Sequence, residues 1–521
     1  MIVKSPAALS FPLASYPGMS PFALDMIAGR ESATRFVGRI AIEDVQIRKN
    51  PRDRDLVRDL ESTNQGWGND VAKRLAAWQR GETLTLVAGQ QVGFGGGPLY
   101  TFAKIASLLK IQQRLELLGK ASTVFFWMAT EDHDFDEVTT LLLVGPDGPN
   151  KLRSKDRGQG KSVGSLPLPD DLRKSLLAIP GFANAPWLDE GMSFRDSFAT
   201  LLGSAFRGRI VLVDSLLPSL RRLGADLFKD VVRSIDEANE LVATRTSEVE
   251  AAGYRAQIVR RGDEPYSFLF HVDSDGNRKP VHKQDGDWLI GGENVSEKEL
   301  ISLIESSPES ISTGAVLRPL LQDLVFEPDL FVGGPAEVAY YAQLGGLYER
   351  FHVKQPHVAL RGHALVGSSK LMRTVEKHEV EPGEFFEQVD ELIARRAPEA
   401  IDELHRAGDH ARNILEAEVA EIERLVLPAD RSLERSIQRS RRHLEYHLAK
   451  MIERGQRAIV RRDGERYKAL SSAHDELMPD GVPQDRVVSW LPFWLEYGSR
   501  LVDRMVEQID PDSDTGVVVS L

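Results

Sequence analysis

Residues 84–99 read LTLVAGQQVGFGGGPL, and this stretch decides the fold. Residues 84–88 are a short apolar run that predicts a buried strand. A glycine-rich loop follows at 89–97, and a helical pattern starts at Pro98, whose missing N–H costs nothing in a first helical turn. A second apolar run, residues 123–128, predicts another strand. Strand, loop, helix and strand make a βαβ unit, which implies a parallel sheet.

The same pattern recurs later in the chain. Residues 210–213 predict a strand that ends at Asp214, and 330–332 predict a strand followed by a Gly-Gly-Pro turn and a helix. Two segments without this pattern, at about 145–205 and 250–310, are predicted as insertions into the α/β core. The second of them contains turn and strand signals that are typical of a small β-meander.

The C-terminal part of the chain predicts two long amphipathic helices. Apolar residues recur at three- and four-residue steps between 383 and 475, with a break at 428–430. Such an antiparallel helical hairpin cannot bury its apolar stripe alone, so it needs a partner surface. We therefore predict a core at 1–380, a coiled-coil hairpin at 381–475 that mediates dimerisation, and a segment at 476–521 that packs back on the core.

Composition excludes several classes of protein. The 521 residues include no cysteine, which rules out disulfides, cysteine-ligated metals and a thiol nucleophile. A net charge of -13 argues against nucleic acid or an anionic membrane as the main partner. The chain contains no apolar run of the roughly 18–20 residues that cross a membrane. We expect a cytoplasmic protein.

The glycine loop is the first candidate site. Glycines and a helix N-terminus let a backbone approach an anionic ligand closely, and two glutamines add neutral donors and acceptors. The alternative is a tight strand-to-helix turn without a ligand. The Gly-Gly-Pro turn lies at the same predicted sheet edge, where ligands bind in doubly wound folds. The candidate binding residues here are Gln90, Gln91, Gly93, Gly95, Gly96, Gly97, Gly333, Gly334, Glu337 and Tyr341.

The acidic run EDHDFDE at 131–137 is the second candidate site. It follows a strand, so its side chains are candidates for a general base, an ammonium site or a divalent-ion site, and the alternative is a solvated loop. The candidate catalytic residues are Glu131, Asp132, His133 and Asp134, and no metal is assigned. Arg318, Gln322 and Asp323 are further binding candidates, although Arg318 and Asp323 could also form a structural salt bridge.

Several of these stretches together resemble the cysteine ligases of bacillithiol biosynthesis, the BshC family. They are GQQVGFGGGPLYTFAK (89–104), FWMATEDHDFDEV (126–138), LRPLLQD (317–323), FVGGPAEVAYYAQLGGLYERF (331–351) and LMPDGVPQDRVVSWLPFWLEYG (477–498). The resemblance implies a Rossmann-like parallel-sheet core with two inserted connecting segments, and a long α-helical coiled-coil hairpin that forms a homodimer. It also implies that L-cysteine is joined to the amine of glucosaminyl malate. One departure is PHVALRGHALVGSSK at 356–370, where the family pattern would place small residues after a Pro-Arg pair.

The hypothesis is that the glycine loops bind anionic groups of the nucleotide or malate. Glu131, Asp132 or Asp134 would hold an amine, and His133 would be the general base. Because the chain has no cysteine, it cannot form a thioester on its own thiol, so we expect ATP on chemical grounds although no motif proves it. The alternatives are an adenylating enzyme or nucleotidyltransferase for another amino acid, and a non-catalytic nucleotide-sensing coiled-coil protein.

Overall fold

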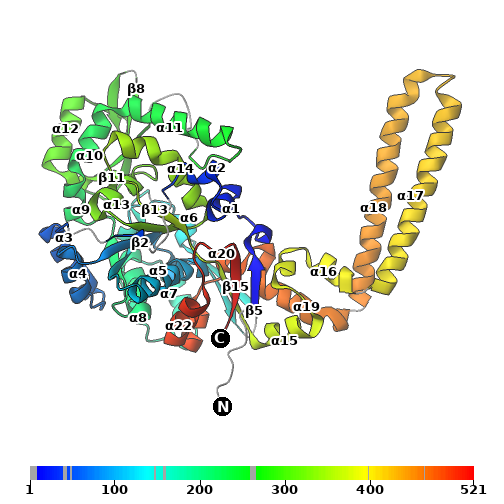
Figure 1. The fold of residues 1–521 in the computed structure, drawn as a ribbon, viewed down its shortest axis with the longest axis horizontal. Helices are drawn as coiled ribbons and strands as arrows, with labels where there is room; N and C mark the ends of the chain where they lie inside the picture. Colours follow the sequence, from blue (N-terminus) through cyan, green and yellow to red (C-terminus); the bar gives the residue numbers. More distant parts are fainter. Residues whose placement is uncertain are drawn as a thin grey trace, which may run out of the picture. The chain divides into compact units, whose positions relative to one another are not determined.

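The computed structural model describes residues 9–38, 44–46, 50–145, 148–155, 160–258, 266–284, 286–396, 398–462 and 464–521. The chain divides into two compact units. The first contains residues 1–366 together with 484–521, and the second contains residues 367–483. Figure 1 shows the helices and strands of both units, coloured along the chain.

The core of the first unit is a five-stranded sheet in the order β13-β12-β2-β3-β6. Its strands are β2 (Leu84–Gln90), β3 (Ser122–Met128), β6 (Val211–Asp214), β12 (Leu330–Gly333) and β13 (His357–Leu360). Every neighbouring pair is parallel, so the predicted parallel core is confirmed. The chain runs outward from β2 to one edge and then from β12 to the other, which is the Rossmann-like arrangement with a switch point between these two strands.

Helices cover this sheet because its strands are apolar on both faces. All seven residues of β3 are buried, as expected for a parallel strand between two layers of helices. The helix after β2 is α5 (Leu99–Leu117), and the helix after β12 is α14 (Pro335–Arg350). Pro335 starts α14, whereas Pro98 lies just before α5 as its N-cap. The other helices around the core are α1 (Pro21–Ile27), α2 (Glu31–Thr34), α3 (Arg54–Gly66), α4 (Ala72–Gln79), α9 (Pro218–Leu223), α10 (Ala225–Arg233), α11 (Ile235–Ala251) and α13 (Arg318–Phe326).

Two segments are inserted between the core strands. The first, between β3 and β6, contains α6 (Phe135–Val138), the antiparallel pair β4 (Thr140–Gly145) and β5 (Gly148–Arg153), α7 (Asp170–Leu177) and α8 (Phe194–Phe206). The second, between β6 and β12, contains β7 (Tyr266–Val272), β8 (Arg278–Gln284), β9 (Asp287–Ile290), β10 (Glu293–Val295), α12 (Glu297–Ser306) and β11 (Ile311–Thr313). Its strands form an antiparallel sheet in the order β10-β9-β8-β7-β11, so the predicted meander gains β11 as an edge strand.

The C-terminal residues complete the core of the first unit. They form α20 (Gln484–Val487), α21 (Leu491–Tyr497), α22 (Ser499–Gln508) and β15 (Thr515–Ser520). β15 pairs with β1 (Leu9–Pro12) in a three-stranded sheet that also contains β14 (Ala364–Gly367). Trp490 and Leu491 are completely buried in the same hydrophobic cluster as the apolar residues of α5.

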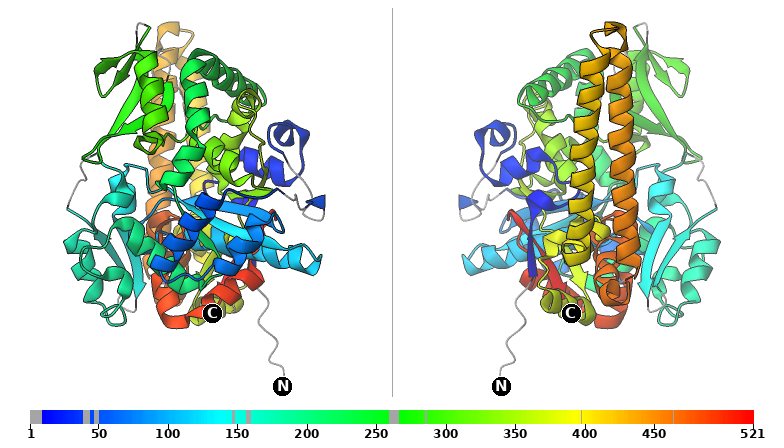
Figure 2. Two further views of the ribbon diagram at one scale, coloured as in Figure 1. Left: turned by 90° about the vertical axis from the view of Figure 1, so that its left-hand side faces the viewer. Right: turned by 90° about the vertical axis from the view of Figure 1, so that its right-hand side faces the viewer.

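The second unit is helical. It contains α15 (Ser369–His378), α16 (Val389–Arg396), α17 (Pro398–Val426), α18 (Glu434–Arg462) and α19 (Gly464–Leu477). α17 and α18 lie side by side as the predicted hairpin (Figure 2), and Arg441 of α18 pairs with Glu423 of α17 at 2.8 Å. Among the described helices of the chain, none is both long enough and apolar enough to cross a membrane.

Candidate active site

A pocket of about 260 Å³ lies where β2, β3 and β12 end, at the switch point of the sheet. Segments that are far apart in the sequence meet here because parallel strands end at the same sheet edge. The polar residues of its lining are Gln90, Gln91, Trp127, Asp132, Glu137, Arg318, Gln322, Glu337, Tyr340 and Tyr341. Carboxylates, amides, phenols and one guanidinium therefore converge on a single small cavity.

The pocket contains some of the predicted site residues but not others. It brings together Gln90, Gln91, Asp132, Arg318, Gln322, Glu337 and Tyr341. The other predicted residues lie outside its lining, namely Gly93, Gly95, Gly96, Gly97, Glu131, His133, Asp134, Asp323, Gly333 and Gly334. Most of the residues in this second group have packing or hydrogen-bonding partners within the protein.

Glu131 is completely buried and supports the pocket without lining it. Its carboxylate accepts hydrogen bonds from Arg221 at 2.9 Å, from Arg318 Nε at 2.9 Å and from the Thr313 hydroxyl at 3.1 Å. With these partners Glu131 positions Arg318, and its carboxylate is not part of the pocket lining. The alternative salt bridge between Arg318 and Asp323 is wrong, because the carboxylates beside Arg318 are Glu131 and Asp132.

Asp132 presents a carboxylate to the pocket. Gln91 Nε2 donates to its Oδ2 at 3.0 Å, Arg318 Nη2 lies 3.6 Å from the same atom, and Arg278 Nη1 lies 4.0 Å from Oδ1. Burial alone would raise the pKa of Asp132, but the Arg318 charge, the Gln91 hydrogen bond and the Arg278 charge together lower it. Asp132 is therefore ionised at neutral pH and can bind an ammonium group.

His133 and Asp134 point to other partners. The His133 side chain is 55% exposed, and Arg278 Nη1 lies 3.0 Å from its Nδ1. Because a guanidinium can only donate, Nδ1 accepts and the proton of the neutral ring lies on Nε2. Asp134 caps α6 by accepting from the backbone N–H of Glu137 at 3.1 Å. The structure thus gives His133 a fixed tautomer and gives Asp134 a structural role.

The glycines after β2 permit close packing against the C-terminal segment. Gly96 has a φ of +82°, and a Cβ there would lie 2.6 Å from the Trp490 ring. The Trp490 indole also donates to the Gly96 carbonyl oxygen at 3.1 Å. Gly95, with a φ of +62°, is equally enclosed, and a Cβ on Gly93 would lie 3.0 Å from Gly97 Cα. Gly95 and Gly96 therefore answer a packing requirement, and none of the four glycines is part of the pocket lining.

The second glycine turn is closed by a side chain of its own helix. Glu337 accepts from the Gly334 backbone N–H at 2.7 Å, and Lys104 Nζ lies 2.6 Å from the same carboxylate. A carboxylate thus already occupies the N-terminus of α14, where an anionic ligand was predicted. Gly333, the last residue of β12, is buried and does not line the pocket.

Asp323 forms a buried network beside the pocket. Gln322 donates to its carboxylate at 2.9 Å, Tyr341 donates at 3.5 Å, and the Tyr348 hydroxyl makes a short contact with it. Burial raises the pKa of Asp323 to about 7, although these three hydrogen bonds act in the opposite direction. Asp323 therefore titrates near neutrality and anchors Tyr341 at the pocket wall.

Sequence reasoning missed four residues of this region. Lys104, Arg278 and Tyr340 were not among the candidate residues, and Glu137, which belongs to the candidate acidic run, was given no role. Glu137 and Tyr340 line the pocket. A signal existed for Lys104, since a lone lysine in an otherwise apolar helix segment is expected to have a buried partner. Arg278 gave no signal, because it comes from the second insertion and reaches His133 across 145 residues of sequence.

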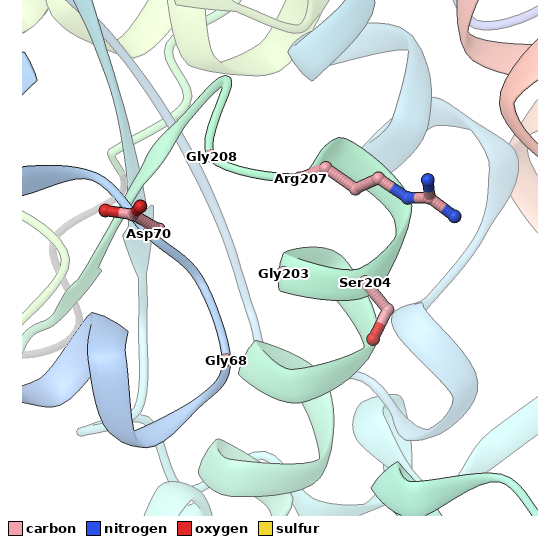
Figure 3. Close-up of a pocket in the computed structure, with 6 residues that line it drawn as sticks. All are labelled: Gly68, Asp70, Gly203, Ser204, Arg207 and Gly208. Atoms are coloured by element: carbon pink, nitrogen blue, oxygen red, sulfur yellow. The ribbon is translucent and has the colours of Figure 1, made fainter.

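A second hollow, of about 510 Å³, lies at the start of β6. Figure 3 shows its lining residues, Gly68, Asp70, Gly203, Ser204, Arg207 and Gly208. The Arg207 side chain points away from Asp70 in this view. Since the hollow lies away from the carboxyl ends of the strands, it is a poor candidate for the chemistry. Within the described residues, no group of three His, Asp or Glu side chains could hold a metal ion.

A doubly wound sheet with a polar pocket at its switch point defines a Rossmann-like enzyme that binds small molecules. Two protein-family models, both described as bacillithiol biosynthesis BshC, match the chain. The N-terminal Rossmann-like domain matches residues 29–362, and the C-terminal coiled-coil domain matches residues 364–521. The chain therefore belongs to the BshC family.

Relatives from several bacteria are similar to the chain over most of its length, and each bears the name "Putative cysteine ligase BshC". The relative from Solibacter usitatus is 29% identical, over 82% of this chain and 83% of its own length. The relative from Koribacter versatilis is 27% identical, over 95% of this chain and 96% of its own. The relative from Bacillus anthracis is 27% identical, over 90% of both chains.

Proposed function

We propose that this protein joins the carboxyl group of L-cysteine to the amine of glucosaminyl malate, as the last step of bacillithiol biosynthesis. The name of its relatives, cysteine ligase, supports this assignment. The observation that carries it is the Asp132 carboxylate in the switch-point pocket, which Arg318 and Gln91 hold in its ionised form. An amine substrate arrives as an ammonium ion, and a partly buried carboxylate is the partner that it needs.

Amide formation from a free carboxyl group requires activation. Because the chain contains no cysteine, it cannot form a thioester on its own side chain, and we infer that ATP provides the phosphoryl or adenylyl leaving group. Arg318 is the cation of the pocket lining and would orient the cysteine carboxyl group before activation. Glu131 holds Arg318 at 2.9 Å, so the guanidinium is fixed before the substrate binds.

We further propose that the protein is cytoplasmic and acts as a homodimer through α17 and α18, without nucleic acid or a membrane as a partner. Large apolar side chains are exposed on both helices, which supports a partner surface. They are Ile414, Ile422, Leu425, Leu433, Leu444 and Met451, of which Leu433 lies at the turn between the helices.

The direct test is to incubate the purified protein with glucosaminyl malate, L-cysteine and ATP, and to detect the thiol product, AMP and ADP by mass spectrometry. We expect product formation that depends on all three compounds. Asp132→Asn should raise the KM for the amine at least tenfold, whereas Asp136→Asn should not, because the Asp136 side chain is 73% exposed and outside the pocket.

Two outcomes would contradict the proposal. Nucleotide exchange with an amino acid other than cysteine, measured against a panel, would indicate an adenylating enzyme with another substrate. Binding of a nucleotide without any turnover would indicate a sensor protein.

A further inference from the structure

Two carboxylates line the pocket, and the Gln91 amide donates hydrogen bonds to both. Asp132 and Glu137 follow β3, and Gln91 follows β2. Gln91 Nε2 donates to Asp132, while Gln91 Oε1 is buried and has no hydrogen-bond partner in the described structure. A primary ammonium group has three N–H donors and no acceptor. The acceptor oxygens of the Asp132 and Glu137 carboxylates therefore match the hydrogen-bonding needs of a primary ammonium group.

A second unpaired polar atom lies in the wall of the pocket. Trp127 lines the pocket, is only 3% exposed, and its indole N–H lacks a partner among the described residues. Buried polar atoms in folded proteins are almost always hydrogen-bonded, to protein, water or ligand. Both unpaired atoms are buried in the wall of the cavity of about 260 Å³, so the polar groups that the cavity offers to a ligand are the carboxylates of Asp132 and Glu137.

The two carboxylates of the pocket have opposite electrostatic environments. Asp132 has a lowered pKa, as described above. Partial burial raises the pKa of Glu137, and the neighbouring charges of Asp134 and Asp132 raise it further, while Gln91 and Lys104 act against the rise. Two acids whose pKa values are pushed apart in one pocket are suited to separate roles, one as a fixed charge and one as a proton acceptor.

His133 is less suited to accept this proton. Its Nδ1 already accepts a hydrogen bond from Arg278, and its ring is not part of the pocket lining. Arg278 is itself fixed, because it donates to the Ser312 hydroxyl at 2.9 Å and stacks on Phe270 at 3.8 Å. Protonation of His133 at Nδ1 would place two donors against each other.

We infer that Glu137 is the general base of the ligation, and that Asp132 and Glu137 together bind the primary ammonium of the acceptor amine. This inference rests on the proposed function. The amine first loses one proton to a Glu137 carboxylate oxygen. Its nitrogen lone pair then forms the C–N bond to the carbonyl carbon of cysteine, activated as an acyl phosphate or acyl adenylate. The bond from that carbon to the phosphoryl oxygen breaks, and the phosphate or AMP leaves with the electron pair. The nitrogen then gives its second proton to the departing phosphate group, which leaves the neutral amide.

The test uses the full-length protein and separates activation from amine attack. Glu137→Gln keeps the size of the side chain and removes the base, so kcat for amide formation should fall by about 10²–10⁴-fold. Hydroxylamine is largely unprotonated at neutral pH and needs no base, so the variant should form cysteine hydroxamate at the wild-type rate. Asp136→Asn, the same chemical change at an exposed carboxylate, should leave both rates unchanged.

The outcomes distinguish this inference from the proposed function. A wild-type protein that forms neither amide nor hydroxamate would contradict the proposed function, and the inference with it. Amide formation by Glu137→Gln within threefold of wild type would overturn only the inference. Loss of turnover in His133→Asn with full activity in Glu137→Gln would identify His133 as the base instead.

The pH dependence provides a further readout. The titratable groups that act on Glu137 are Asp132 and Asp134 beside it and Lys104 and Tyr100 on α5. Wild-type kcat/KM for the amine should fall as Glu137 becomes protonated at acidic pH. This acidic limb should disappear in Glu137→Gln and persist in Asp136→Asn. An unchanged limb in Glu137→Gln would also overturn the inference.

Discussion

Lys104 Nζ lies 2.6 Å from a Glu337 carboxylate oxygen, and this pair joins the two helices that leave the switch point. Lys104 also donates to the Gly89 carbonyl oxygen at 2.8 Å and to Gln90 Oε1 at 2.7 Å. The lysine side chain is only 3% exposed, so its charge depends on these partners. It therefore connects the end of β2 to the start of α14, beside the pocket.

Lys104→Met should destabilise the first unit. The change keeps the length of the side chain but leaves Glu337 without its cation, and removing one partner of a buried ion pair costs about 3–5 kcal/mol. Glu337 is 26% exposed, so we expect the lower end, about 3 kcal/mol, in urea unfolding. Lys73→Met, at an exposed position of α4, is the matched control and should change stability by less than about 0.5 kcal/mol. An equal loss of unfolding free energy in both variants would show that the Lys104–Glu337 pair contributes little to stability.

Gly96→Ala should destabilise the protein more than Gly119→Ala. Both glycines have a positive φ, +82° and +73°, so both substitutions pay the cost of a left-handed L-residue, about 1–2 kcal/mol. Only the Gly96 Cβ would overlap Trp490, at 2.6 Å, whereas a Cβ on Gly119 has no heavy atom within 4 Å. The overlap adds about 1–3 kcal/mol. Thermal unfolding of the two variants measures the difference, and equal melting temperatures would contradict a packing role for Gly96.

The Gly96 contact shows which part of the fold the sequence could not predict, namely a packing contact between distant segments of the chain. The apolar run and glycine loop at 84–97 correctly predict a strand and a sharp turn, because those depend on local backbone preferences. The reason for the glycine at position 96 is Trp490, which is 394 residues away in the chain. A close packing contact and an anion site require the same backbone freedom, so glycines alone could not distinguish them.

The acidic run shows the same limit in the site itself. Its position after β3 correctly placed Asp132 at the sheet edge, since parallel strands end together. The roles within the run depend on partners from other elements, with Arg221 and Arg318 on Glu131 and Arg278 on His133. Charge density therefore predicted a candidate site beside this pocket, but only the tertiary contacts separate a buried support from a pocket-facing carboxylate.

Asp323 should make stability fall as the pH rises from about 4 to about 7. Its pKa is about 7 in the folded protein and near the ordinary aspartate value when unfolded, so the folded state binds more protons in this range. The unfolding free energy should then decrease by on the order of 4 kcal/mol across the window. Asp323→Asn keeps an oxygen for Tyr348 and should remove most of this slope in urea unfolding at several pH values.

The control for this prediction is Asp226→Asn. The Asp226 side chain is 93% exposed, so its removal should preserve the wild-type slope. If the unfolding free energy of Asp323→Asn still decreases by the full wild-type amount between pH 4 and 7, another group is responsible for the pH dependence.

Charged substitutions on α18 should dissociate the proposed homodimer. Leu444 and Met451 are 46% and 64% exposed and seven residues apart, so they lie on one helix face two turns apart. Two glutamates there would bring like charges into a two-fold interface and remove its apolar contacts.

Sedimentation velocity should show a dimer for wild type and a monomer for Leu444→Glu/Met451→Glu. Circular dichroism should stay unchanged, because neither side chain is buried in the hairpin. Glu445→Lys, at a partly exposed polar position between them, should remain dimeric. A dimer that survives the double substitution would place the interface on another surface, and a monomeric wild type would contradict the homodimer itself.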